Sequence, residues 1–355
     1  MKIHNFSAGP CILPQEVFQK SAAAILDLNG TGLSILEISH RSPDFVAIME
    51  ESRSLAIELL DLEGKGYHAL FLQGGASMEF LRVPYNFLSR KSAYLDTGTW
   101  ADLAIKEANR FGETDTVASS KDQKYTYIPT DFTIPADADY FHCTSNNTIF
   151  GTQMKTFPIT DVPMVCDMSS DIFSRKIDFS QFDLIYAGAQ KNLGPAGVTL
   201  VVIKDSFLKM TSKTDIPPIM DYRKHVEKES MYNTPAVFAV YTSLLTMKWL
   251  KANGGILAME QINNAKAELL YNEIDRNPFF SGTSNIPDRS AMNATFVLND
   301  VAMTQDFDLM WKAAGISGLV GHRSVGGYRA SMYNAMPLES VQILVDVMKE
   351  FELKR

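Results

Sequence analysis

The sequence has few cysteines, and their spacing is typical neither of a metal site nor of a disulfide framework. Its 355 residues include only three, Cys11, Cys143 and Cys166, which lie far apart and form no CxxC pair. Scattered cysteines of this kind are typical of reduced thiols in an intracellular protein. We therefore expect a cytoplasmic protein that binds no metal.

Long hydrophobic runs are also absent. The first fourteen residues lack the apolar core of a secretory signal, and the apolar residues 236–250 are interrupted by threonine, serine and Lys248. A membrane-spanning helix needs about 20 mostly apolar residues. The sequence therefore predicts no membrane segment.

Positive charge is not in excess. Lys and Arg total 33 against 41 Asp and Glu, which gives a net charge of −8. This balance disfavours nucleic acids and anionic membranes as partners. Two common phosphate-binding motifs, GxGxxG and the Walker A motif, are missing as well. Any anion is therefore expected to bind at a local site.

What the sequence does contain is a regular alternation of short apolar runs and helical stretches from Tyr67 onward. This alternation predicts an α/β fold with a mainly parallel sheet that helices cover on both faces. The pattern changes at Gly254 and Gly255, where a long charged helical stretch begins. We expect a large domain over residues 15–255, a smaller α+β domain over 256–355, and a segment 1–14 that packs with the small domain.

Two helices are predicted ahead of this alternation. One begins at Pro14 and is expected to stop at Gly30. The other begins with Ser42 as N-cap and Pro43 in the first turn, and runs towards Leu60.

A lysine, Lys191, lies in the turn between two runs that read as buried strands, "LIYAG" and "VTLVVI". Burial disfavours the ammonium form, lowers the pKa and makes the amine a nucleophile. Asp167 ends the apolar run "PMVCD", which should lie beside the strand that ends at Gly188. Both side chains would then share a crevice at the carboxyl ends of the strands. The alternative is a surface lysine with its amine in water.

An amine and a carboxylate in one crevice describe a pyridoxal phosphate site, where the amine bonds to the aldehyde and the carboxylate faces the ring nitrogen. The stretch "LFLQGGASMEF" supplies a strand, two glycines and the start of a helix, an arrangement that binds phosphate. The glycines alone equally fit a tight turn. Trp100, at another turn from strand to helix, could stack on the ring or belong to the core.

With these residues in place, the sequence resembles the phosphoserine aminotransferases, which are fold type I enzymes dependent on pyridoxal phosphate. The resemblance extends over nearly the whole chain, through "NFSAGP", "EISHR", "YAGAQKNLGPAG", "MYNTP", "KWLKANGG" and "GHRSVGGYRASMYNAMPLE". It implies a large domain with a mainly parallel seven-stranded sheet and a smaller α+β C-terminal domain.

The resemblance also assigns cofactor contacts. It implies that Lys191 is the Schiff-base lysine, that Asp167 pairs with the pyridine nitrogen and that Trp100 stacks on the ring. Asn233 and Thr234 would reach the phosphate from the other subunit of a homodimer, although Thr234 alone also fits an N-cap in a turn before a helix. The remaining implied contacts are Gln190 and Thr148 with the cofactor, and Ala76 and Ser77 with its phosphate.

Basic residues are concentrated in "EISHR" and "GHRSVGGYR". The resemblance implies that Arg329 holds the α-carboxylate of the amino acid, and that Arg41, His322 and Arg323 bind the substrate phosphate, some of them across the dimer interface. His40 is expected to bind substrate as well. Without the resemblance, Arg41 fits a helix N-terminal region and Arg323 fits a solvated position. Some family members carry arginine where Ser77 stands, so phosphate affinity is set differently here.

The implied reaction transfers the amino group of L-glutamate to 3-phosphohydroxypyruvate and gives O-phospho-L-serine and 2-oxoglutarate, a step of serine biosynthesis. The resemblance leaves open a second activity, the formation of 4-phosphohydroxythreonine for pyridoxine biosynthesis. The alternatives are another fold type I enzyme, such as an alanine:glyoxylate aminotransferase or a cysteine desulfurase, and a non-catalytic ligand-binding protein on the same scaffold.

Overall fold

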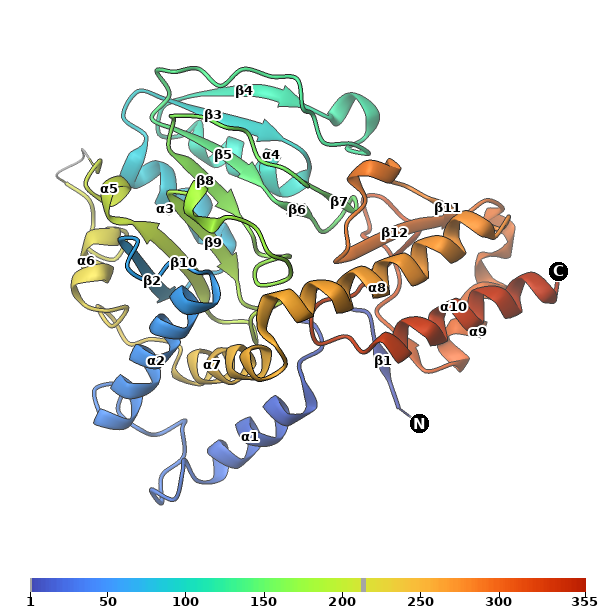
Figure 1. Cartoon of the computed structure of the whole chain (residues 1–355), viewed down its shortest axis with the longest axis horizontal. Helices are drawn as coiled ribbons and strands as arrows, with labels where there is room; N and C mark the ends of the chain where they lie inside the picture. The colour runs from blue at the N-terminus through green and yellow to red at the C-terminus, as the bar shows by residue number, and fades with distance from the viewer. Residues whose placement is uncertain (1, 212–214) are drawn as a thin grey trace.

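The computed structural model describes residues 2–211 and 215–355, and its largest element is a seven-stranded sheet (Figure 1). Every neighbouring pair in the sheet is parallel except the two pairs that involve the strand from Thr199 to Lys204. This is the mainly parallel sheet that the sequence predicts. In order across the sheet the strands are β2 (Tyr67–Leu72), β10 (Thr199–Lys204), β9 (Leu184–Gly188), β8 (Met164–Asp167), β5 (Tyr140–Thr144), β3 (Lys91–Asp96) and β4 (Glu113–Ser119).

Helices cover both faces of this sheet, which explains why its central strands are apolar along their whole length. On one face, α3 (Ala76–Phe87) and α4 (Thr99–Ala108) contribute Phe80, Phe87 and Ala104 to a core with Leu70 and Val201. On the other face, the core includes residues of α1 (Gln15–Leu26), α2 (Pro43–Leu59) and α7 (Val237–Ala252). The large sheet is therefore packed between two separate apolar layers.

The edge strand β4 is absent from the sequence-based prediction. Its residues, ETDTVAS, carry little apolar character, and all of them are at least partly exposed. An edge strand pairs on one side only, so it can be polar and leaves a weak hydrophobic signal.

The two predicted N-terminal helices are present, but the first ends earlier than expected. It stops at Leu26 rather than Gly30, because Asp27 leaves the helical conformation and Ile35 N of the returning loop donates to Ala24 O at 2.9 Å. The start of α2 is confirmed, because Ser42 Oγ accepts from Phe45 N at 3.4 Å.

The C-terminal part has its own sheet and core. Its three antiparallel strands are flanked by helices, and Phe280, Phe296, Phe307 and Phe351 pack within its core. The N-terminal strand β1 (His4–Asn5) pairs in parallel with β13 (Ile316–Ser317) of this part. The elements are α8 (Gly255–Arg276), β11 (Phe280–Gly282), β12 (Asn293–Leu298), α9 (Thr304–Ala313), β14 (Tyr328–Ser331) and α10 (Leu338–Leu353).

The remaining described elements are short. Among the described residues, no helix has both the length and the apolar character needed to cross a membrane. The short elements are β6 (Asn146–Asn147), β7 (Thr152–Gln153), α5 (Asp205–Leu208), α6 (Tyr222–Glu227) and the 3₁₀ turns Lys121–Gln123, Phe179–Gln181, Ile286–Asp288 and Val301–Met303.

Candidate active site

The carboxyl ends of β2, β3, β5, β8 and β9 meet at one edge of the large sheet, because these strands all run in the same direction. Ligands of open α/β sheets bind at this edge. The segments that follow the strands bring Lys191, Thr148 and Trp100 close to one another, and Asp167 lies at the end of β8 itself.

Lys191 is held by side chains from two other segments. Its Nζ donates to Thr148 Oγ1 at 2.7 Å and lies 5.9 Å from the ring centroid of Trp100. Burial lowers the pKa of Lys191 to about 8 against the opposing attraction of the Asp167 carboxylate, and the positive charge of Arg329 lowers it further. A neutral, nucleophilic amine is therefore accessible near neutral pH.

Asp167 is 5% exposed, and its Oδ1 accepts hydrogen bonds from Ser169 N at 2.9 Å and from Ser169 Oγ at 2.6 Å. Burial raises the pKa of Asp167, while the charge of Lys191 and the bonds from Ser169 oppose this rise. The sequence analysis did not identify Ser169. A serine two residues after a strand-ending aspartate is a weak signal, because it indicates a local turn equally well.

The start of α3 is an uncapped helix N-terminus. Gly74 and Gly75 lead into it with φ of +116° and +69°, and a Cβ on Gly74 would lie 2.5 Å from Met78 Cβ. No side chain among the described residues caps this helix, so the backbone N–H groups at Ala76 and Ser77 are placed to bind an anion.

Asn233 lies beside the same turn. Its Nδ2 donates to Gln73 Oε1 of the same chain at 2.7 Å, next to Gly74, while Thr234 is exposed. The helix that follows begins at Val237 with Ala236 as its N-cap, so Thr234 is not the N-cap of α7.

Trp100 is placed by the start of α4. A Cβ on Gly98, two residues earlier, would lie 2.8 Å from Asn147 Oδ1, so a larger residue there would displace the Asn147 side chain. The indole is partly exposed, and its Nε1 is buried without a hydrogen-bond partner in the described part of the chain. Gln190 is half-buried next to Lys191, and its carbonyl oxygen accepts from Cys11 N at 3.2 Å.

A half-buried arginine lies on the C-terminal side of the site. Nη1 of Arg329, on β14, lies 3.5 Å from Thr148 O, and its buried Nε finds no partner among residues 2–211 and 215–355. Burial lowers the pKa of Arg329, and it lowers that of His322 together with the charges of Arg329 and Arg323. Three basic residues of "GHRSVGGYR" therefore lie close enough for the charges of the two arginines to act on His322.

His40 and Arg41 are placed differently. They lie between α1 and α2, Arg41 is exposed, and no hydrogen bond or ion pair between described residues joins either one to Lys191, Thr148 or Arg329. One chain therefore brings Lys191, Asp167, Thr148 and Trp100 together with Arg329, but it does not join the "EISHR" pair to them.

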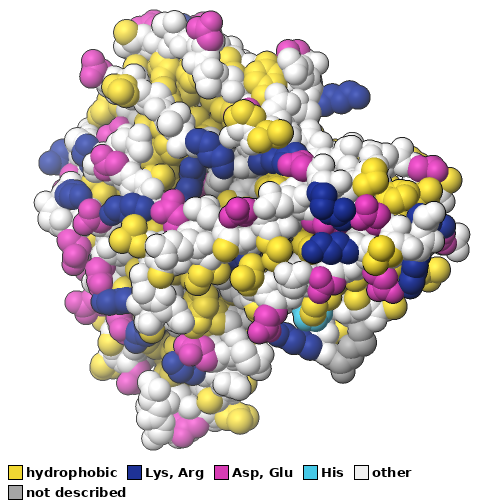
Figure 2. All heavy atoms as spheres, turned by 45° about the vertical axis from the view of Figure 1, so that its right-hand side comes forward, with side chains coloured by type: hydrophobic (Ala, Val, Ile, Leu, Met, Phe, Trp, Pro, Cys, Tyr) yellow, Lys and Arg dark blue, Asp and Glu magenta, His cyan; other side chains and the backbone are white. Residues whose placement is uncertain are grey.

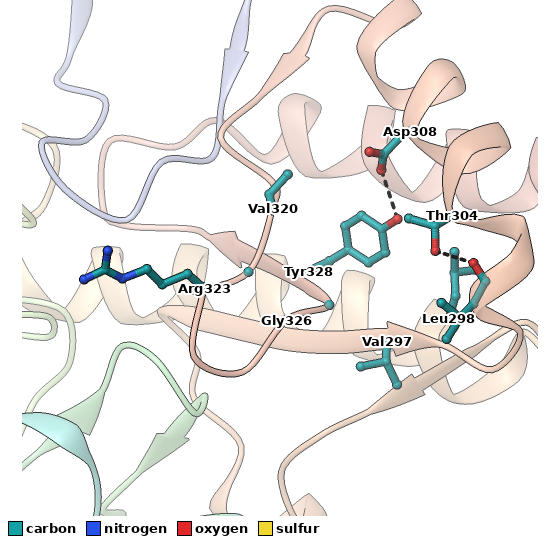
Figure 3. Close-up of a pocket in the computed structure, with 11 residues that line it drawn as sticks. Val297, Leu298, Thr304, Asp308, Val320, Arg323, Gly326 and Tyr328 are labelled. Carbon is teal, nitrogen blue, oxygen red and sulfur yellow. Dashed lines mark hydrogen bonds between the residues drawn. The ribbon is translucent and has the colours of Figure 1, made fainter.

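Charged side chains are intermixed over the face that Figure 2 shows, so no single-sign region there identifies a ligand. A cavity of about 330 Å³ lies in the C-terminal part between β12, α9 and the loop before β14 (Figure 3). Tyr328 OH donates to Asp308 Oδ1 at 3.0 Å there, and Arg323 points away from the Tyr328 ring. Lys191, Asp167, Thr148 and Trp100 are not among the residues that line this cavity.

The residues around Lys191 fit pyridoxal phosphate. They provide an amine of lowered pKa, a buried carboxylate, an aromatic ring beside the amine and an uncapped helix N-terminus. The described residues contain no group of three or more His, Cys, Asp or Glu side chains that could hold a metal ion.

Comparison with known proteins agrees with this arrangement. The class-V aminotransferase family matches residues 3–344. A phosphoserine aminotransferase of Flavobacterium johnsoniae is 69% identical over 356 aligned residues, which cover 100% of both chains. The structure of phosphoserine aminotransferase from Bacillus circulans subsp. alkalophilus is similar with a TM-score of 0.96 at 42% identity, covering 100% of this chain and 99% of that one.

A third relative was solved with the cofactor. The phosphoserine aminotransferase of Trichomonas vaginalis, described as PLP-bound, is similar with a TM-score of 0.93 at 35% identity over 98% of this chain and 100% of that one. The predicted fold is thereby confirmed, and pyridoxal phosphate is the cofactor that the family uses. The chain belongs to the class-V aminotransferases and, within them, to the phosphoserine aminotransferase family.

Proposed function

We propose that this chain transfers an amino group between L-glutamate and 3-phosphohydroxypyruvate, giving 2-oxoglutarate and O-phospho-L-serine for serine biosynthesis. The observation that carries the proposal is the buried Lys191 amine with Asp167 and Arg329 around it. An alanine:glyoxylate activity is not favoured, because a relative 69% identical over the full length is a phosphoserine aminotransferase. Whether 4-phosphohydroxythreonine is also formed is a question for the same assay.

The cofactor roles follow from the chemistry of each side chain. When bound, pyridoxal phosphate supplies an electron sink for negative charge at the substrate Cα. Asp167 holds the proton at the ring nitrogen, and Lys191 Nζ, whose pKa burial lowers to about 8, takes the proton from Cα. The cofactor is positioned by Trp100, Gln190 and Thr148, and its phosphate by Ala76, Ser77, Asn233 and Thr234.

The substrate roles follow from charge and burial. Arg329 is half-buried with an unpartnered Nε among the described residues, so its guanidinium suits the α-carboxylate of the amino acid. The substrate phosphate is bound by Arg41, His322 and Arg323, and His40 is a further substrate contact. Ser77, which is exposed, offers the cofactor phosphate a hydroxyl where some family members carry an arginine.

The working form is a homodimer with shared sites. Support comes from the "EISHR" pair, which one chain does not join to Lys191, and from exposed leucines nearby. Leu26, Leu33 and Leu36 are 84%, 49% and 63% exposed, which is typical of a surface that a partner covers.

We also propose a cytoplasmic location and a division into residues 15–255 and 256–355, with segment 1–14 on the smaller domain. The three cysteines are free, which fits a reducing compartment. The separate core of the C-terminal part, which includes Phe6, supports the division.

The substrate assignment is tested by comparing acceptors. The protein loaded with pyridoxal phosphate is given L-glutamate and one acceptor at a time, and the 2-oxoglutarate formed is measured. The acceptors are 3-phosphohydroxypyruvate, 3-hydroxy-2-oxo-4-phosphooxybutanoate, hydroxypyruvate and glyoxylate. We expect kcat/KM to be highest for a phosphorylated acceptor, because an acceptor without a phosphate leaves the phosphate-binding side chains without a partner. A higher kcat/KM for glyoxylate or hydroxypyruvate would overturn the assignment.

Shared sites are tested by mixing two variants that we expect to have lowered activity, Lys191→Ala and Asn233→Ala. If Asn233 serves the partner's site, a mixed dimer contains one site with both residues intact, and activity rises on mixing. If Asn233 acts within its own chain, every site lacks one of the two residues. Activity that stays at the level of the separate variants would then contradict the shared arrangement.

A further inference from the structure

We propose that Ser169 is a positioning residue for the transamination, whose hydroxyl orients the Asp167 carboxylate and maintains its charge opposite the cofactor's ring nitrogen. The inference rests on the proposed function, because it needs pyridoxal phosphate in the crevice. It concerns a side chain that touches Asp167 and has no direct role at the reacting atoms.

The geometry of the contact is specific. Ser169 is 5% exposed, and its backbone N and its Oγ both donate to Oδ1 of Asp167, at 2.9 Å and 2.6 Å. A distance of 2.6 Å is in the range of hydroxyl bonds to a charged carboxylate. Within residues 2–211 and 215–355, no hydrogen bond ends on the other oxygen, Oδ2. That oxygen is therefore left for a ligand.

A third contact orients the hydroxyl itself. Gly188 N donates to Ser169 Oγ at 3.1 Å. Since this bond occupies an acceptor position of Oγ, the single hydroxyl proton is directed to Asp167, and the two bonds in series strengthen each other. Gly188 is the last residue of β9 and lies three residues before Lys191. Ser169 thus fixes the carboxylate of β8 to the strand that leads to the lysine.

The contact also opposes a penalty. Burial disfavours the charged form of Asp167 and raises its pKa, and the donors of Ser169 act in the opposite direction. A protonated Asp167 would not hold the ring-nitrogen proton by charge. The hydroxyl therefore contributes to cofactor binding through the protonation state of its neighbour.

The test is the affinity of the cofactor-free protein for pyridoxal phosphate, measured by fluorescence titration across pH. For Ser169→Ala we expect the dissociation constant to rise on the order of tenfold, since a donor to a charged group is lost. We also expect the pH below which affinity falls to move up by about one unit, because the carboxylate then protonates more readily. Ser169→Thr keeps the hydroxyl and should restore most of both.

Ser170→Ala is the matched control. Ser170 is the next residue and is 2% exposed, but its Oγ donates to Asn146 O at 2.8 Å rather than to Asp167. Removing this buried hydroxyl should lower the melting temperature of the cofactor-free protein as much as Ser169→Ala does. Ser170→Ala should nevertheless keep the wild-type dissociation constant and the wild-type pH limit, meaning the pH below which affinity for pyridoxal phosphate falls.

Two results would overturn the proposal: a wild-type dissociation constant and pH limit in Ser169→Ala, or an equal change of both in Ser170→Ala. Neither depends on the acceptor substrate. A wrong acceptor assignment would leave these titrations unchanged, and a failure of the titrations would leave the acceptor comparison unchanged.

Discussion

Lys191 and Asp167, at the inner end of the site, differ from Arg41 and Arg323, which we propose form its outer end, in how the protein holds them. Lys191 Nζ donates to Thr148 Oγ1, Asp167 accepts from Ser169, and burial shifts both pKa values. The outer arginines are exposed and lie in segments outside the large sheet. The large sheet thus positions the inner pair, whereas the proposed substrate recognition depends on exposed segments that we expect a ligand or a partner chain to complete.

The largest effect is expected for the inner amine. Lys191→Ala should lower kcat with L-glutamate and 3-phosphohydroxypyruvate by roughly 10⁴-fold, the upper end of what a positioned proton-transfer group contributes. Steady-state kinetics at saturating pyridoxal phosphate measures this loss.

A second lysine serves as the control for Lys191. Burial also lowers the pKa of Lys155 to about 8, but its Nζ donates to Arg289 O at 2.6 Å, away from the crevice. Lys155→Ala should therefore keep a kcat near that of the wild type. A kcat for Lys191→Ala above about one hundredth of wild type would contradict the role of the inner amine.

The next effect concerns the carboxylate. Asp167→Asn keeps the shape of the side chain and removes its charge, so we expect kcat to fall by about 10²-fold, as for the loss of other preorganised electrostatic groups. Circular dichroism should show the wild-type fold. A variant that folds and keeps its full kcat would show that the charge is not needed.

Arg329 lies between the inner and outer groups in burial, and the expected effect is intermediate. Arg329→Lys keeps the charge but loses the guanidinium fork, so KM for L-glutamate should rise about tenfold. The KM values for both substrates distinguish the roles. If KM for L-glutamate were unchanged and KM for the phosphorylated acceptor were raised, Arg329 would bind the substrate phosphate rather than the α-carboxylate.

The smallest effect is expected for an outer cation. Arg323→Ala should raise KM for 3-phosphohydroxypyruvate by about threefold to fivefold at low salt and less at high salt, because exposed charges are screened. The KM for L-glutamate is the internal control. A change in kcat as large as that of Asp167→Asn would remove the distinction between the two ends of the site.

Much of the inner site could be predicted from the sequence. Asp167 and Lys191 each follow an apolar run long enough for a buried strand, and neighbouring parallel strands place such residues at one edge. Ser42 and Pro43 predicted the start of α2 because capping is a local property. The sequence alone could support these predictions because each depends on a few adjacent residues.

Other features depend on contacts that the local sequence does not contain. Thr148 and Arg329 meet across 181 positions of the chain. The strand β4 is too polar to be recognised, and Ser169 gains its significance only from Gly188 on the next strand. The end of α1 at Leu26 likewise depends on Ile35, which returns to the helix from the following loop.

The most direct test of the account is to reduce the protein loaded with pyridoxal phosphate with borohydride and to map the modified peptide. The account predicts a single modified lysine, Lys191, because its buried amine is the one next to Asp167 and Trp100. Modification of Lys155 or any other lysine in its place would contradict the central claim.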